Sequence, residues 1–161
     1  MSAFSQAWIL IKAPLRGTSG KHFDRAIESG RFEPREGSGY FSTDRGVWAT
    51  KGDGWQDADA AFHYAIRGDS GHTEQFNRAP VVHYIPRTEN YSTNTGAGEG
   101  SIRFPGGVDA NTTEEIWRGQ TFSDWLNENK PPYQYDPFQS YRKGQRELFM
   151  DAWRKWAEAR Q

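Results

Sequence analysis

The stretches Leu15-Arg16-Gly17-Thr18 and Gly39-Tyr40-Phe41-Ser42-Thr43-Asp44 carry most of the information about the fold. Each lies at the end of a short apolar segment whose length and composition predict a β-strand. The first strand is expected over residues 7–13, with Pro14 as its end, because proline cannot donate a hydrogen bond to a sheet. The second is expected over residues 40–43. An arginine and a Ser-Thr pair therefore each end a short apolar strand.

Helices are predicted wherever apolar residues recur with helical spacing. Ser19-Gly20 begins the first of them and Gly30 ends it. Asp57 and Gly68 bound the clearest helix. The capping box Thr112-Thr113-Glu114-Glu115 predicts a further one. The apolar stripes of the predicted helices are, in chain order, Phe23, Ala26 and Ile27; Ala58, Ala61, Phe62, Ala65 and Ile66; Ile116 and Trp117; Phe122, Trp125 and Leu126; and Leu148, Phe149, Ala152, Trp153 and Trp156.

Further strands are expected over residues 47–50, 79–85 and 102–104, where short apolar runs are bounded by turn residues. Between the last two, residues 88–100 are mainly Ser, Thr, Asn and Gly, which predicts a long loop. Loops of that length in compact domains are usually functional or disordered. This loop is therefore a candidate place for a binding or catalytic group.

The order of these elements predicts an α+β fold, with a small mixed or antiparallel sheet, flanking helices and a helical C-terminal appendage. A chain of 161 residues is long enough for one domain with a real core. We place the main domain at residues 1–110 and the appendage, packed on it, at residues 111–161.

Composition excludes several classes of function. A formal net charge of −1 gives no strong signal for DNA binding, which needs a basic surface. The absence of cysteine excludes disulfides and thiol catalysis. The apolar run at residues 8–11 is too short for a membrane span or a signal peptide. We therefore expect a cytoplasmic protein with no membrane partner.

Two common kinds of ligand site are also excluded by spacing. The four histidines, at positions 22, 63, 72 and 83, do not have the spacing of metal ligands, so no metal is expected. The glycine-rich segment at residues 96–100 lacks the lysine and the following helix of a phosphate-binding loop. Residues 15–18 and 39–44 thus remain the main indication of a chemical function.

The element order through Phe104 resembles that of the ADP-ribosyltransferase family, over about two thirds of the chain. The matching landmarks are Arg16-Gly17-Thr18 after the first strand, Ser29-Gly30-Arg31-Phe32 at the end of the first helix, Gly39 to Asp44 as the second strand, Ala60 to Ala65 as the helix behind the pocket, Pro80-Val81-Val82 as the next strand, and Glu99 to Gly107 as the segment that carries the family's glutamate.

The resemblance implies that NAD is the substrate and that ADP-ribose is transferred to a macromolecular target, either a host protein or a nucleic acid such as RNA. Cleavage of NAD builds positive charge on the ribose, while the diphosphate carries negative charge. The family pattern then makes Arg16 and Glu99 the catalytic residues, with Arg16 on a phosphate or ribose oxygen and Glu99 at the developing cation. It assigns NAD binding to Arg16, Gly17, Thr18, Tyr40, Ser42 and Thr43, and base stacking to Tyr40, Phe41 or Tyr91.

The chain departs from the family at one position. The family's glutamate directly precedes the apolar strand, where this chain has Ser101, and Glu99 lies two residues earlier. Three explanations stay open: the loop register differs, Glu114 or Glu115 takes the role, or the fold is kept without the chemistry.

Two other functions are considered. Small, polar, tryptophan-rich chains of this kind look similar to phage-encoded proteins that act on host machinery, so a non-catalytic inhibitor of a host factor or defence system, with exposed tryptophans as anchors, is one alternative. Within the residues from Glu115 onward, the motifs Asp136-Pro137-Phe138-Gln139, Arg146-Glu147-Leu148 and Ala152-Trp153-Arg154 resemble the ribosome modulation factor family. That resemblance implies RNA contact through Arg146, Arg154 and aromatic rings. The simpler interpretation, which we favour, is that Trp153 and Trp156 pack on the main domain.

Overall fold

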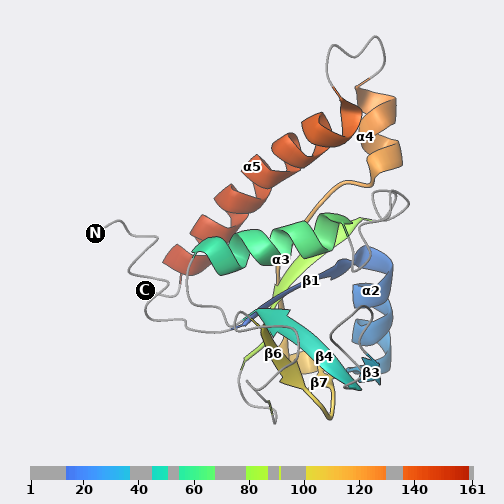
Figure 1. Cartoon of the computed structure of the whole chain (residues 1–161), viewed down its shortest axis with the longest axis vertical. Coiled ribbons are helices and arrows are strands. Elements are labelled where there is room, and N and C mark those ends of the chain that lie inside the picture. The colour runs from blue at the N-terminus through green and yellow to red at the C-terminus, as the bar shows by residue number, and fades with distance from the viewer. Residues whose placement is uncertain are drawn as a thin grey trace.

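The structure, a computed structural model, describes residues 14–36, 45–50, 55–67, 79–86, 91, 101–129 and 136–159. The described elements form small antiparallel sheets with helices on either side and a long C-terminal helix (Figure 1). The α+β fold class is therefore confirmed. The elements are β1 (Leu15–Ser19), α2 (Gly20–Ser29), β2 (Arg31–Phe32), β3 (Arg35–Glu36), β4 (Arg45–Thr50), α3 (Trp55–Arg67), β5 (Pro80–Tyr84), β6 (Ser101–Phe104), β7 (Val108–Asp109), the 3₁₀ turn η2 (Ala110–Thr112), β8 (Glu114–Arg118), α4 (Phe122–Glu128) and α5 (Pro137–Glu158).

The sheet that organises the molecule has the strand order β1-β5-β8, with both pairs antiparallel. Because side chains alternate along a strand, the sheet has two distinct faces. Leu15, Val82 and Trp117 lie on one face and pack with α3 and α5 in the first core cluster. Arg16 and His83 lie on the other face, toward α2.

A β-bulge in β8 decides which side chains reach each face. Val82 is opposite Trp117, but His83 is opposite Glu115, so Ile116 is an extra residue in β8. The bulge lets Ile116 and Trp117 both enter the first core cluster. It also places Glu115 on the same face as His83.

The second sheet, β3-β4-β6, meets the first where β4 ends. The Thr50 hydroxyl accepts a hydrogen bond from the amide of Leu15 at 3.2 Å and donates one to the Leu15 carbonyl at 3.1 Å. A second core cluster, which includes Phe23, Phe32 and Phe104, fills the space around this sheet, the β2-β7 pair and α2. The two clusters lie on opposite faces of the β1-β5-β8 sheet.

Helices α2 and α3 largely follow the sequence pattern. Ser19 caps α2 by accepting from the amide of His22, and Gly30 ends it with φ of 86°. The predicted stripe of α2 is wrong at Ile27, whose side chain is exposed. All five residues of the predicted α3 stripe are buried. However, α3 already begins at Trp55, so Asp57 lies inside the helix and is not its cap.

Helix α5 packs along the body of the protein, as the C-terminal tryptophans predicted. In Figure 1 it lies on the side of α3 away from β4 and β6. Trp153 and Trp156 are buried, and Trp156 lies 5.1 Å from the ring of Tyr84. Arg146 bonds to Asp59 of α3 at 2.8 Å. Leu148 is the exception in the predicted stripe, because its side chain is 61% exposed.

One predicted element is wrong in its local assignment. The capping-box segment does not begin a helix, since residues 114–118 form β8 and the Thr113 hydroxyl donates to the carbonyl of Tyr84. Leu15–Ser19, the first described strand, is not predicted as a strand, since the strand expected before Pro14 covers residues 7–13. The predicted strands over 7–13 and 40–43 lie outside the described residues, as does the 88–100 loop apart from Tyr91.

Within the described parts of the chain, no helix is long and apolar enough to cross a membrane. The division at residue 110 stays a prediction, although β8, which follows it, belongs to the β1-β5-β8 sheet.

Candidate functional site

Of the residues predicted to contact NAD, the structure describes Arg16, Gly17 and Thr18, which lie in β1, and Tyr91, an exposed residue whose ring lies 6.2 Å from that of Phe104. Tyr40, Ser42, Thr43 and Glu99 lie outside the described residues, and so does Phe41. The structure therefore gives the geometry around Arg16 but not its relation to the Ser-Thr pair.

Gly17 lies where α3 comes closest to β1. A methyl group built on Gly17 would overlap the carbonyl oxygen of Ala61 and lie 2.5 Å from the amide nitrogen of Ala65. Only glycine fits between this strand and helix. Arg16 and Thr18, on either side of it, therefore point to the opposite face of the sheet, where both are buried.

Arg16 is a buried cation, 8% exposed. Its Nη1 lies 3.3 Å from Nε2 of His83 on the neighbouring strand β5. Its guanidinium carbon lies 5.3 Å from the centre of the Phe32 ring, within the range of a cation–π contact. Arg16 is thus oriented both by a hydrogen bond and by an aromatic face.

His83 is completely buried and contacts two aromatic rings. Its ring stacks on Phe32 at 4.9 Å, and the ring of Phe23 meets it edge-on at 5.1 Å. Its Nδ1 lies 2.5 Å from the hydroxyl oxygen of Thr113, which in turn donates to the carbonyl of Tyr84 at 2.6 Å. Both ring nitrogens of His83 therefore have partners.

Burial lowers the pKa of His83 well below 6.5, and the positive charge of Arg16 and the nearby His22 lower it further. His83 is therefore neutral at physiological pH. Because the partner is neutral, the Arg16–His83 hydrogen bond orients the guanidinium without cancelling its charge.

A row of residues across three strands extends from Arg16 to a carboxylate. Arg16 is opposite His83, and His83 is opposite Glu115. Two strand spacings of about 4.8 Å separate the backbones of Arg16 and Glu115. Glu114 lies in the row of Leu15 and Tyr84 instead, on the other face. Of the two alternative carboxylates in β8, the structure therefore brings Glu115 onto the face of Arg16.

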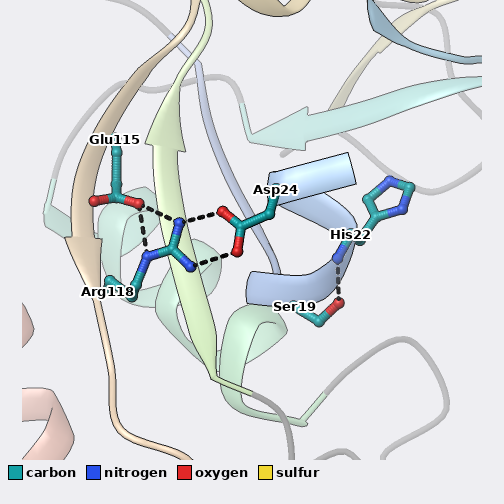
Figure 2. A network of polar contacts seen from close by, with 5 residues as sticks. All are labelled: Ser19, His22, Asp24, Glu115 and Arg118. Atoms are coloured by element: carbon teal, nitrogen blue, oxygen red, sulfur yellow. Dashed lines mark hydrogen bonds and ion pairs between the residues drawn. The ribbon is translucent and has the colours of Figure 1, made fainter. Parts of the chain in front are cut away.

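Glu115 takes part in an ion-pair network at the edge of this face (Figure 2). Arg118 contacts Glu115 at 2.7 Å and binds Asp24 of α2 through two nitrogens, at 2.8 and 3.1 Å. Residues three apart in a regular strand point to opposite faces, so the Glu115–Arg118 pair depends on the bulge at Ile116. The network connects the outer strand of the sheet to α2.

The charges in this network stabilise one another. Hydrogen bonding to Arg118 lowers the pKa of Asp24, and hydrogen bonding to Asp24 raises the pKa of Arg118. Glu115 and Asp24 are both exposed. Glu115 is therefore a solvent-accessible carboxylate whose position is set by a cation.

Sequence reasoning missed His83 and Thr113. The alternation in β5 contains a usable signal, since His83 follows Val81 at a spacing of two and must share its buried face. The pairing of His83 with Arg16, 67 positions earlier, has no local signal. Among the residues that the structure describes, no three His, Asp or Glu side chains come together as a metal site would require.

Comparisons of the chain with protein-family models, with curated proteins and with solved structures found no match.

Proposed function

We propose that the protein is an ADP-ribosyltransferase that cleaves NAD and transfers ADP-ribose to a macromolecular target in the cytoplasm. The observation that supports this most is the state of Arg16. Its guanidinium lies 3.3 Å from the neutral ring of His83 and 5.3 Å from the centre of the Phe32 ring, and these two contacts fix its orientation. A preoriented planar cation is the group that a diphosphate binds best, because it offers two parallel N–H donors.

In the proposed reaction, the bond between the ribose C1′ and the nicotinamide nitrogen breaks, and nicotinamide leaves with the electron pair. A nucleophile of the target forms the new bond to C1′ and loses its proton. Arg16 binds the diphosphate, and a carboxylate stabilises the positive charge that develops on the ribose. Glu115 is the described candidate for that carboxylate, and Glu99, which lies outside the described residues, is the other.

The test is transfer of labelled ADP-ribose from NAD to components of a cell extract. We expect the unaltered protein to label a target and Arg16→Lys to lose at least tenfold in rate, because lysine keeps the charge but loses the paired donors. Arg25, exposed on α2, supplies the matched control: Arg25→Ala should label as the unaltered protein does. If the unaltered protein neither labels a target nor is stabilised by NAD, the proposed function is rejected.

The two neighbouring glutamates provide a sharper comparison. Glu115→Gln should retain NAD binding and lose transfer, since the charge acts on the transition state rather than on the bound substrate. Glu114→Gln, on the other face, should change neither. Equal activity of the two variants would remove Glu115 from the reaction and leave Glu99 as the carboxylate to test.

The two alternatives receive less support. Trp117, Trp153 and Trp156 are buried, so these three tryptophans are not surface anchors for a partner. In the C-terminal helix, Arg146 contacts Asp59 and Arg154 contacts Asp151, so both arginines that the RNA-binding alternative needs form ion pairs within the protein.

A further inference from the structure

The hydrogen bonds around His83 form a chain of four groups from three parts of the sequence. It runs from the Arg16 guanidinium on β1, through the His83 ring on β5 and the Thr113 hydroxyl before β8, to the carbonyl of Tyr84. The groups at the two ends of this hydrogen-bond chain can each play only one role. A guanidinium only donates hydrogen bonds and a carbonyl only accepts them.

These fixed ends permit one arrangement of protons. The Thr113 hydroxyl has one hydrogen and gives it to Tyr84, so its oxygen accepts from Nδ1 of His83. Nδ1 therefore carries the ring hydrogen, and Nε2 is left with a lone pair. That lone pair accepts from Nη1 of Arg16, which requires the same tautomer independently.

The surroundings keep the ring in this position. Stacking on Phe32 fixes the plane of the imidazole, and the ring of Phe23, which also contacts Phe32, meets the imidazole at a steep angle. The same Phe32 ring lies under the guanidinium of Arg16. Rotation of either group would therefore break an aromatic contact as well as a hydrogen bond.

We infer that His83 is a positioning residue for Arg16, and that Thr113 selects the tautomer in which His83 holds the guanidinium. Loss of the Thr113 hydroxyl leaves the Nδ1 hydrogen without its acceptor, so the tautomer with hydrogen on Nε2 becomes competitive. In that tautomer Nε2 cannot accept from Arg16. The consequence for ligand binding rests on the proposed function, whereas the orientation of Arg16 does not.

The test compares Thr113→Val with Thr113→Ser, because valine has the shape of threonine without the hydroxyl and serine keeps the hydroxyl. ¹⁵N NMR of the full chain reports the His83 tautomer and the rate at which the two Nη groups of Arg16 interchange. We expect the unaltered protein and Thr113→Ser to show a hydrogen on Nδ1 and slow interchange. Thr113→Val should show mixed tautomers and interchange about tenfold faster, as for the loss of one hydrogen bond to a charged group.

A second pair of variants acts on the ring itself. Glutamine carries an acceptor near the position of Nε2, whereas asparagine carries a donor near the position of Nδ1 but does not reach Arg16. His83→Gln should therefore keep Arg16 more ordered than His83→Asn does. Melting temperatures identify any variant that has lost its fold, and the Thr113 pair decides the question in that case.

NAD affinity separates this inference from the proposed function. If both hold, Thr113→Val binds NAD about tenfold more weakly and Thr113→Ser binds it normally. Altered Arg16 motion in a protein that does not bind NAD supports the positioning role and rejects the ADP-ribosyltransferase. Unchanged His83 and Arg16 signals in folded Thr113→Val overturn the positioning role, whatever the NAD affinity.

Discussion

At the scale of single residues, the site combines the guanidinium of Arg16 with the titratable ring of His83. Both contact the aromatic ring of Phe32. Arg16 and His83 are both buried, and burial of two groups that can each be positive is tolerated only if one stays neutral. His83 is the neutral group because burial, and then the charge of Arg16, lowers its pKa, and Thr113 and Arg16 satisfy its two nitrogens. Because His83 stays neutral in the folded protein, the free energy of unfolding decreases when the solution becomes acidic.

The first prediction concerns the pH dependence of stability. In the unfolded chain His83 binds a proton near pH 6.5, whereas in the folded protein burial, Arg16 and His22 keep its pKa well below that value. The unfolded state then binds more protons below pH 6.5, so the free energy of unfolding falls as the pH falls. His83 contributes a slope of up to about 1.4 kcal/mol per pH unit below pH 6.5, and none above it.

Urea unfolding between pH 5 and 8 measures this slope. The matched comparison is His83→Gln, which keeps an acceptor for Arg16 and does not titrate, while the other histidines contribute to both proteins. The two stability curves should run parallel above pH 7 and converge toward acid. Curves that stay parallel down to pH 5 would show that His83 is protonated in the folded protein.

At the scale of secondary-structure elements, the close approach of α3 to β1 positions the helix against the sheet that carries Arg16. Gly17 permits that approach, because α3 occupies the space that a side chain would need. Any side chain there must separate the helix from the sheet, and α3 carries five buried residues of the first core cluster.

The second prediction compares two glycine-to-alanine changes. Gly17→Ala should destabilise the fold by about 3 kcal/mol or more, because the new methyl group overlaps helix backbone that has no rotamer to adjust. Gly144→Ala lies inside α5 with open space around it and should stabilise by about 0.5–1 kcal/mol, since alanine is the better helix former. Chemical denaturation gives both values. Equal effects of the two changes would contradict the packing argument.

Some of these elements can be predicted from the sequence and others cannot. Helices α2, α3, α4 and α5 are predicted by apolar spacing, although Ile27 of α2 is exposed and α4 fully buries only Phe122. The helix predicted from the capping box at Thr113 is wrong, because the hydroxyl of Thr113 caps no helix. It donates instead to a carbonyl 29 positions earlier, in a strand that no local pattern connects to it.

The candidate site likewise has features that the sequence predicts and features that it does not. The sequence predicts Arg16 just after a strand that ends at Pro14, whereas the structure places it inside β1. The sequence does not predict that His83 contacts Arg16 or that Glu115 shares their face, because both follow from strand pairing and from the bulge at Ile116. A shift of one residue exchanges Glu114 and Glu115 between faces, so spacing alone cannot select the carboxylate.

At the scale of the whole molecule, the first core cluster combines residues from both sides of position 110. Leu15, Phe62 and Val82 pack there with Trp117 and Phe149. The ring of Phe62 stacks on Phe149 at 5.2 Å and lies 5.4 Å from Trp117. A core shared in this way is lost from both parts when the chain is divided, because each part then exposes the apolar face that the other covers.

The third prediction is therefore that residues 1–110 do not fold alone. This fragment lacks β8, which pairs with β5, and lacks α5, which covers α3. Circular dichroism of the fragment should show little cooperative unfolding in urea, whereas the whole chain should unfold in one transition by both circular dichroism and tryptophan fluorescence. Addition of a peptide of residues 111–161 should restore part of the structure, because it supplies the missing strand and helix. A fragment that unfolds cooperatively by itself would instead establish residues 1–110 as an independent domain, and the region after position 110 as a true appendage.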